Sequence, residues 1–203
     1  MTTLEEGLFL VKLARSTITK YVTDSSKACP PTPPSESLGE KTGVFVTIEK
    51  LHGGEKVLRG CIGYPLPYMP LVDATVECAV CAAVSDPRFP PLKSSELKDI
   101  LIEVSVLTQP KLLEAKNHGD YPRMIKVGRD GLIVEGGYDK GLLLPQVPVE
   151  YGWDEETFLS QCCMKAGSPP DCWLSKETKV YTFTAEVFSE TTPDGEVRRK
   201  DLS

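Results

Sequence analysis

Apolar residues recur at intervals of three and four along the first stretch of the chain, and further on they alternate strictly with polar ones. The first pattern predicts an amphipathic helix over residues 4–22, and Thr3 with Glu6 predicts a capping box at its start. A second helical pattern, rich in small residues, covers residues 70–84. The alternating pattern predicts four strands, at residues 44–50, 57–64, 101–107 and 180–188.

These elements predict an α+β fold in which the four strands form one antiparallel sheet flanked by the two helices. The turn signal His52-Gly53-Gly54 joins the first two strands as a hairpin.

Short apolar segments also alternate with glycine turns between residues 125 and 144. Residues 125–127 and 132–135 predict a hairpin around the turn 128–131, and the turn 136–141 leads to a third short strand. A helix is expected after Asp154.

We therefore expect a single domain over residues 1–203, with a larger lobe of residues 1–124 plus 171–203 and a smaller lobe of residues 125–170. Pro193-Asp194-Gly195 and the charged segment after it predict a mobile tail.

Composition narrows the possible partners. A formal net charge of −6, with basic residues scattered apart from Arg198-Arg199-Lys200, argues against duplex nucleic acid and leaves room for a small anion site. No N-terminal signal segment and no stretch of membrane-spanning length are visible, so we expect a cytoplasmic protein with no membrane partner. The seven cysteines are then expected to be reduced, and the single Cys78-x-x-Cys81 pair with only two histidines predicts neither a metal nor a cofactor.

The segment Leu58-Arg59-Gly60-Cys61-Ile62-Gly63 places a cation and a thiol inside an apolar strand pattern. Alternation puts Arg59 and Cys61 on one face of the strand. Cys61 can be a small packing residue, or a reactive thiol beside a positive charge. Gly60 and Gly63 need a reason such as a bulge, close packing or the close approach of a ligand.

Two further segments carry polar groups that could join this site. Glu103 and Ser105 lie on the polar face of the strand 101–107, and the right pairing and register would bring them to the face of Cys61. Asp86 and Arg88 flank Pro87 on a stiff loop, as an internal ion pair or as the rim of a ligand site. His52 lies in the hairpin turn, too far along the strand to act as a base for Cys61.

Six segments, in order over nearly the whole chain, resemble the AMMECR family, named after the Alport syndrome, mental retardation, midface hypoplasia and elliptocytosis chromosomal region. Arg-Gly-Cys-Ile-Gly is the specific signature among them, and the length resembles the stand-alone prokaryotic form. The segments are Gly43-Val44-Phe45-Val46-Thr47, Leu58-Arg59-Gly60-Cys61-Ile62-Gly63, Asp86-Pro87-Arg88-Phe89, Ile102-Glu103-Val104-Ser105-Val106-Leu107, Leu143-Leu144-Pro145-Gln146 and Lys165-Ala166-Gly167.

The resemblance implies two unequal lobes with the signature residues near an inter-lobe cleft. It also implies a role in a multi-protein pathway, because related domains occur beside or fused to Memo-like and radical S-adenosylmethionine proteins. It does not imply a particular reaction.

Three functions remain open. The first is an enzyme in which Cys61 is a nucleophile or redox thiol, Arg59 lowers its pKa or holds an anionic substrate, and Glu103 handles protons. The second is a binding module for a small anionic or nucleotide-like ligand, or a modified peptide. The third is an adaptor for partner proteins. The candidate catalytic residues are Cys61 and Glu103, and the candidate ligand-binding residues are Arg59, Gly60, Gly63, Asp86, Arg88, Ser105 and Gln146.

Overall fold

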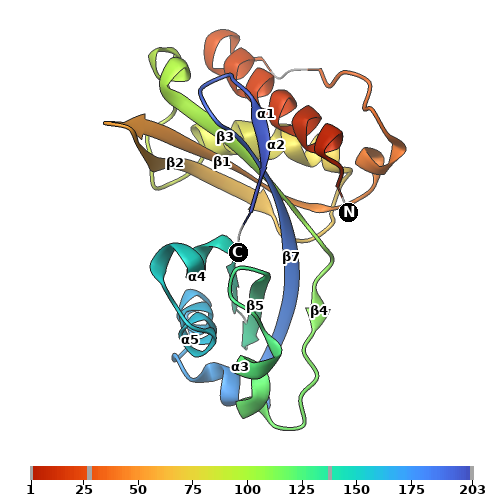
Figure 1. Ribbon diagram of the computed structural model, residues 1–203, viewed down its shortest axis with the longest axis vertical. Helices are drawn as coiled ribbons and strands as arrows, with labels where there is room; N and C mark the ends of the chain where they lie inside the picture. Colours follow the sequence, from red (N-terminus) through yellow and green to blue (C-terminus); the bar gives the residue numbers. More distant parts are fainter. Residues whose placement is uncertain (1, 27–28, 137–138, 202–203) are drawn as a thin grey trace. The chain divides into compact units, whose positions relative to one another are not determined.

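The structure, a computed structural model, describes residues 2–26, 29–136 and 139–201. Its helices and antiparallel strand pairs confirm the predicted α+β class (Figure 1). The chain divides into two compact units, the first reaching to Leu107 and resuming over Glu186–Lys200, the second spanning Thr108–Ala185. These boundaries differ from the expected lobes, because residues 108–124 and 171–185 belong to the second unit.

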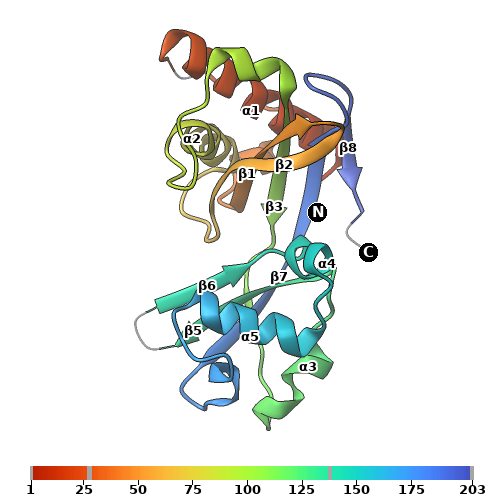
Figure 2. The same cartoon turned by 90° about the vertical axis from the view of Figure 1, so that its left-hand side faces the viewer.

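The first unit is built on a sheet in the order β2, β1, β3 and β7, with β8 paired to β7. Helices α1 and α2 lie on the same side of this sheet (Figure 2). The core between these helices and the sheet holds the even-numbered residues of β1 and β3, such as Val46 and Ile102. The elements are α1 (Leu4–Asp24), η1 (Glu36–Gly39), β1 (Gly43–His52), β2 (Glu55–Tyr64), α2 (Leu71–Val84), η2 (Ser94–Asp99), β3 (Ile100–Leu107), β7 (Lys179–Glu190) and β8 (Val197–Lys200).

Local signals account for the ends of these elements. The capping box is confirmed, since the Thr3 hydroxyl accepts from the Glu6 N–H and the Glu6 carboxylate accepts from the Thr3 N–H. The β1–β2 hairpin turns at Gly53 and Gly54, both of which have positive φ, the conformation that tight hairpin turns require. The charged tail was predicted to be mobile. This prediction is wrong for Val197–Lys200, which pair with β7 as β8.

The second unit has a small sheet in which β5 lies between β6 and the first half of β7, and β4 pairs with β7. Helix α5 lies across β5 and β6 (Figure 2), and its Phe158 and Leu159 are fully buried. The elements are β4 (Lys111–Leu112), η3 (His118–Asp120), α3 (Tyr121–Met124), β5 (Asp130–Gly136), β6 (Asp139–Leu143), α4 (Gln146–Tyr151), α5 (Glu155–Lys165) and η4 (Cys172–Leu174).

The N-cap predicted at Asp154 is confirmed, because its carboxylate accepts from the Thr157 N–H. The prediction of a strand at residues 125–127 is wrong: these residues lead from α3 into the turn 127–129, and the Lys126 N–H donates to the Asp130 carboxylate. The hairpin forms instead between β5 and β6, and residues 137–138 of its expected turn lie outside the described residues.

The expectation that all seven cysteines are reduced is also wrong, because Cys163 and Cys172 form a disulfide. Its Cα atoms are 5.9 Å apart, within the span that a disulfide bridges, and it joins the end of α5 to η4. Sequence spacing alone does not reveal this pair, since the approach of η4 to α5 is a tertiary contact. Within the described parts of the chain, no helix is both long enough and apolar enough to cross a membrane.

Candidate functional site

One row of polar side chains crosses three neighbouring strands of the first unit. Thr47 on β1 pairs with Cys61 on β2 and with Glu103 on β3. We call Cys61, Thr47 and Glu103 the polar row. It lies on the face opposite α1 and α2, because Val46 and Ile48 on either side of Thr47 enter the core. The register therefore confirms that Glu103 shares a face with Cys61.

A second row follows on the same face, where Phe45 pairs with Gly63 and with Ser105. Three residues of the two rows are buried: Ser105 is fully buried, Glu103 is 4% exposed and Thr47 is 9% exposed. Phe45 and Gly63 are half-buried. Cys61 is half-buried.

Cys61 is held by both its side chain and its backbone. The Thr47 hydroxyl donates to Cys61 Sγ at 3.3 Å. The Cys61 N–H donates to Asp86 Oδ2 at 2.8 Å, and the Cys61 carbonyl accepts from Arg88 Nη2 at 3.2 Å. Asp86 and Arg88 thus bind the backbone groups that an edge strand leaves without a strand partner.

Asp86 and Arg88 are also an internal ion pair. Arg88 Nε and Nη2 donate to the two Asp86 oxygens at 3.0 and 2.7 Å, and the Arg88 N–H donates to the same carboxylate at 3.1 Å. The guanidinium keeps the pKa of Asp86 down at about 2 despite burial. The Arg88 side chain is 53% exposed, so its outer face can still contact a ligand.

Arg59 is directed to a different partner. The register between β1 and β2 shifts at a bulge, where Ile48 pairs with Gly60 and Glu49 pairs with Leu58, so Arg59 is the extra residue. The strict alternation predicted for residues 57–64 is therefore interrupted at Arg59.

The Arg59 guanidinium donates to both oxygens of Glu96, at 3.1 and 3.0 Å, and lies over the Phe89 ring. Lys50 binds the same carboxylate at 2.9 Å. The Arg59 hydrogen bonds are the largest cause that lowers the pKa of Glu96 to about 2.

The charge around Cys61 does not favour a thiolate. Burial raises the pKa of the Cys61 thiol above its ordinary value. The Thr47 hydrogen bond and the Arg88 charge lower it, whereas the nearby carboxylates of Glu103 and Asp86 raise it. The net direction of the pKa is upward, opposite to the lowering that activates a nucleophilic thiol.

Glu103 has a cationic partner that sequence reasoning missed. Lys200 Nζ donates to Glu103 Oε2 at 3.2 Å. Lys200 is the last residue of β8, and it pairs with Val187 of β7. No local signal predicts this contact, because 97 residues separate the two side chains in the sequence.

The two signature glycines allow close packing. A Cβ at Gly60 would lie 2.2 Å from the Ala82 carbonyl oxygen, on the last turn of α2. A Cβ at Gly63 would lie 2.2 Å from the Phe45 ring and 2.5 Å from the Val44 carbonyl oxygen. Backbone approach to α2 and to β1 is thus a sufficient physical reason for both glycines.

Gln146 belongs to the second unit, where it is buried at the start of α4. His52 lies opposite Glu55 at the turn end of the hairpin. Thr47 was not singled out by sequence reasoning, although its place on the polar face of a hairpin strand was a usable signal.

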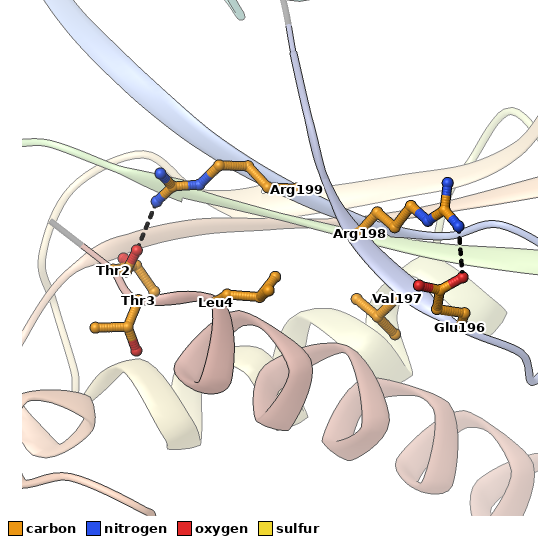
Figure 3. A pocket seen from close by; sticks show the side chains of 7 residues that line it. All are labelled: Thr2, Thr3, Leu4, Glu196, Val197, Arg198 and Arg199. Carbon is orange, nitrogen blue, oxygen red and sulfur yellow. Dashed lines mark hydrogen bonds and ion pairs between the residues drawn. The ribbon is translucent and has the colours of Figure 1, made fainter.

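A separate pocket of about 410 Å³ lies between the start of α1 and β8 (Figure 3). Arg199 donates to the Thr2 carbonyl at 2.6 Å and to Glu186 at 2.7 Å, and Arg198 donates to Glu196 at 2.8 Å. Its basic side chains are thus bound by groups of this chain. The lining residues are Thr2, Thr3, Leu4, Glu196, Val197, Arg198 and Arg199.

The comparisons with known proteins identify the class. The AMMECR1 family model matches residues 11–188, and the chain therefore belongs to the AMMECR1 family, as its signature segments predicted.

Full-length relatives show how closely it matches members of this family. A protein from Thermococcus onnurineus (strain NA1) is 59% identical over 199 residues, covering 98% of this chain and 97% of that one. A protein from Methanopyrus kandleri is 55% identical over 202 residues, covering 99% and 96%. The crystal structure of an uncharacterized protein from Pyrococcus horikoshii matches with a TM-score of 0.92 and 54% identity over 97% of both chains.

Proposed function

We propose that this protein is a binding module whose site is the polar row of the first unit, together with Arg88 beside it. The observation that carries the proposal is the set of contacts at Cys61: its Sγ accepts a hydrogen bond from the Thr47 hydroxyl, and its backbone is bound by Asp86 and Arg88. Burial raises the pKa of this thiol. Such a constellation offers donors and acceptors to a ligand but no activated nucleophile.

The alternative of a cysteine-dependent enzyme has less support. Nucleophilic thiols are lowered in pKa by a base or a cation, and the cation expected for this role, Arg59, is bound by Glu96 instead. Arg88 does lower the pKa of Cys61, but burial is the larger effect. The Glu103 carboxylate is bound to the Lys200 ammonium, and this ion pair makes Glu103 a poorer general base.

The residues divide into those that would contact a ligand and those that would position them. Arg88 is the group for an anionic part of the ligand, because its guanidinium is half exposed at the edge of β2. Thr47, Cys61 and Glu103 supply the hydrogen-bonding row. The positioning residues act in three ways. The backbone of β2 is held by Asp86 and packs closely because of Gly60 and Gly63. Arg59 holds η2 through Glu96, and Ser105 belongs to the second row, beside Phe45.

The adaptor alternative concerns surfaces rather than this row. A role beside Memo-like or radical S-adenosylmethionine proteins stays a prediction from the family resemblance, and so do the inter-lobe cleft and a contribution of Gln146. None of the contacts described above depends on these partners.

Equilibrium dialysis against a deproteinised cell extract, followed by mass spectrometry of the retained small molecules, tests the proposal. The wild-type protein should retain at least one small molecule that the Thr47→Val variant retains much less. Cys61→Ser should still retain it, because a hydroxyl can accept the same hydrogen bond from Thr47.

The matched control is Thr157→Val in the second unit, which removes a hydroxyl of the same size from the partly exposed first turn of α5. Thermal unfolding checks that each variant is folded. If neither the wild type nor the Thr157→Val control retains a small molecule, the binding module is contradicted. A covalent mass increase on Cys61 of the wild type, lost in Cys61→Ser, would favour thiol chemistry instead.

A further inference from the structure

We propose that the Glu103 carboxylate receives the primary ammonium group of a small-molecule ligand on an unbranched carbon chain, and that Lys200 holds this position in the unliganded protein. The inference rests on the proposed function, because it names the ligand chemistry of the polar row. It is carried by the Glu103–Lys200 contact, which the binding proposal itself does not require.

The first step concerns the carboxylate. Glu103 is 4% exposed, and a charge removed from water to that degree is costly unless a partner neutralises it. Lys200 Nζ, at 3.2 Å from Glu103 Oε2, supplies a neutralising charge. A ligand that displaces Lys200 must therefore bring a cation of its own.

The second step concerns the mobility of Lys200. Its side chain is 36% exposed, seven times the 5% of the Glu103 side chain, so part of the Lys200 side chain contacts solvent. The proposal requires the ammonium to leave the carboxylate by rotation about the side-chain bonds of Lys200, a motion that needs no change in the backbone of β8.

The strand that carries Lys200 is anchored by other residues. Val197 is 6% exposed in the core under α1, and Arg199 is bound to Glu186 and to the Thr2 carbonyl (Figure 3). Arg199 also lies over the Phe188 ring. Displacing the Lys200 ammonium therefore leaves the pairing of β8 with β7 in place.

The third step concerns the type of cation. A primary ammonium has three N–H donors on a compact head, whereas a quaternary ammonium has none. Thr47 lies directly opposite Glu103 across β1 and β3, where paired Cβ atoms are roughly 5 Å apart. A head that donates to the carboxylate can thus also donate to the Thr47 hydroxyl, which in this structure donates to Cys61.

The chain length follows from Lys200 itself. The ammonium at Glu103 is carried by an unbranched four-carbon stem, so an n-butylammonium ion reproduces the displaced group. Arg88, on the other side of Cys61, remains available for an anionic group of the same ligand.

The test titrates the full-length protein with n-butylammonium chloride, monitored by NMR signals of Thr47 and Glu103, with tetramethylammonium chloride at equal ionic strength as the control. Lys200→Ala should bind n-butylammonium at least about tenfold more tightly than wild type, because the competing side chain is gone. Tetramethylammonium should not shift these signals. Lys200→Ala/Glu103→Gln should lose the binding.

Equal affinity of wild type and Lys200→Ala, or binding that survives Glu103→Gln, would overturn the inference. If Lys200→Ala does not fold, the wild type decides: n-butylammonium at high concentration should shift the Thr47, Glu103 and Lys200 signals together, and Glu103→Gln should show none of these shifts. Lack of the joint shift counts against the inference.

The two proposals can fail separately. Retention of an extract molecule that depends on Thr47, with no binding of n-butylammonium, refutes only the ammonium site. Binding of n-butylammonium with no retained extract molecule refutes only the binding module.

Discussion

Arg59 and Glu96 form a two-point ion pair, with Nε to Oε1 at 3.1 Å and Nη2 to Oε2 at 3.0 Å. Arg59 lies only two residues before Cys61 in the chain, yet a bulge at this point turns its charge toward η2. The cation that does act on the thiol is Arg88, which comes from the loop after α2. The cation nearest to Cys61 in the sequence is therefore not the one that lowers the pKa of its thiol.

The pKa of Cys61 provides the first prediction. Thr47→Val and Arg88→Gln should raise the pKa further, since both native groups lower it, and Glu103→Gln should lower it. Arg59→Gln should change it much less than Arg88→Gln does, because the Arg59 guanidinium is bound to Glu96. The measurement is the pH dependence of iodoacetamide labelling at Cys61, read by peptide mass spectrometry.

The exposed Cys29 is the internal control for this experiment. At neutral pH, Cys61 should react more slowly than Cys29 in the same sample, because the thiolate is the reactive form. Faster reaction of Cys61, or a rise in its pKa in Arg59→Gln as large as in Arg88→Gln, would restore the activated-thiol hypothesis.

Asp86 provides the second prediction, a pH dependence of stability. Its pKa in the folded protein is about 2, below the ordinary value of 3.8, so its contribution is present above pH 4 and lost as the pH falls toward 2. Asp86→Asn should lower the free energy of unfolding by roughly 1 to 3 kcal/mol at neutral pH, by removing charged hydrogen bonds to Arg88 and Cys61. Denaturant unfolding at several pH values measures the difference.

The gap between wild type and Asp86→Asn should narrow between pH 4 and pH 2, while the exposed Asp171→Asn should show no such gap. Comparison of variants is required because Glu6 and Glu96 also have pKa values of about 2 and contribute to acid unfolding of both proteins. A constant gap across this range would contradict the assigned role of Asp86.

Gly60 provides the third prediction. Gly60→Ala would place a methyl group 2.2 Å from the Ala82 carbonyl oxygen, so α2 or β2 must move, at a cost of roughly 1 to 3 kcal/mol or more. Gly39→Ala is the matched control, since an added Cβ there meets no atom within 4 Å. Thermal unfolding compares the two, and equal melting temperatures would contradict the packing explanation of Gly60.

The disulfide provides the fourth prediction. Thiol titration of the denatured, unreduced protein should find five free cysteines, and seven after reduction. Replacing both Cys163 and Cys172 by alanine should lower the free energy of unfolding by about 2 to 3 kcal/mol, because the short loop between them is no longer closed in the unfolded chain. A count of seven before reduction would contradict the disulfide.

Local pattern was sufficient for most elements but not for irregular ones. The spacing of apolar residues predicted α1 and α2 within a few residues, since a helix that buries one face must repeat near 3.6 residues. The segment 125–127 misled the same reasoning, because Ile125 is buried at the end of the short helix α3 rather than in a strand. An apolar residue signals burial, whatever element achieves it.

By itself, the sequence determined the α+β class, the β1–β2 hairpin and the polar character of one sheet face, because helix caps, hairpin turns and strand alternation act over a few residues. Only the tertiary structure decided the bulge at Arg59 and the register that aligns Cys61 with Thr47 and Glu103. The same holds for the Glu103–Lys200 contact and for the Cys163–Cys172 disulfide. Each joins residues through the packing of separate elements, and the free energy that selects one register or one distant partner is a property of the whole core rather than of any local segment.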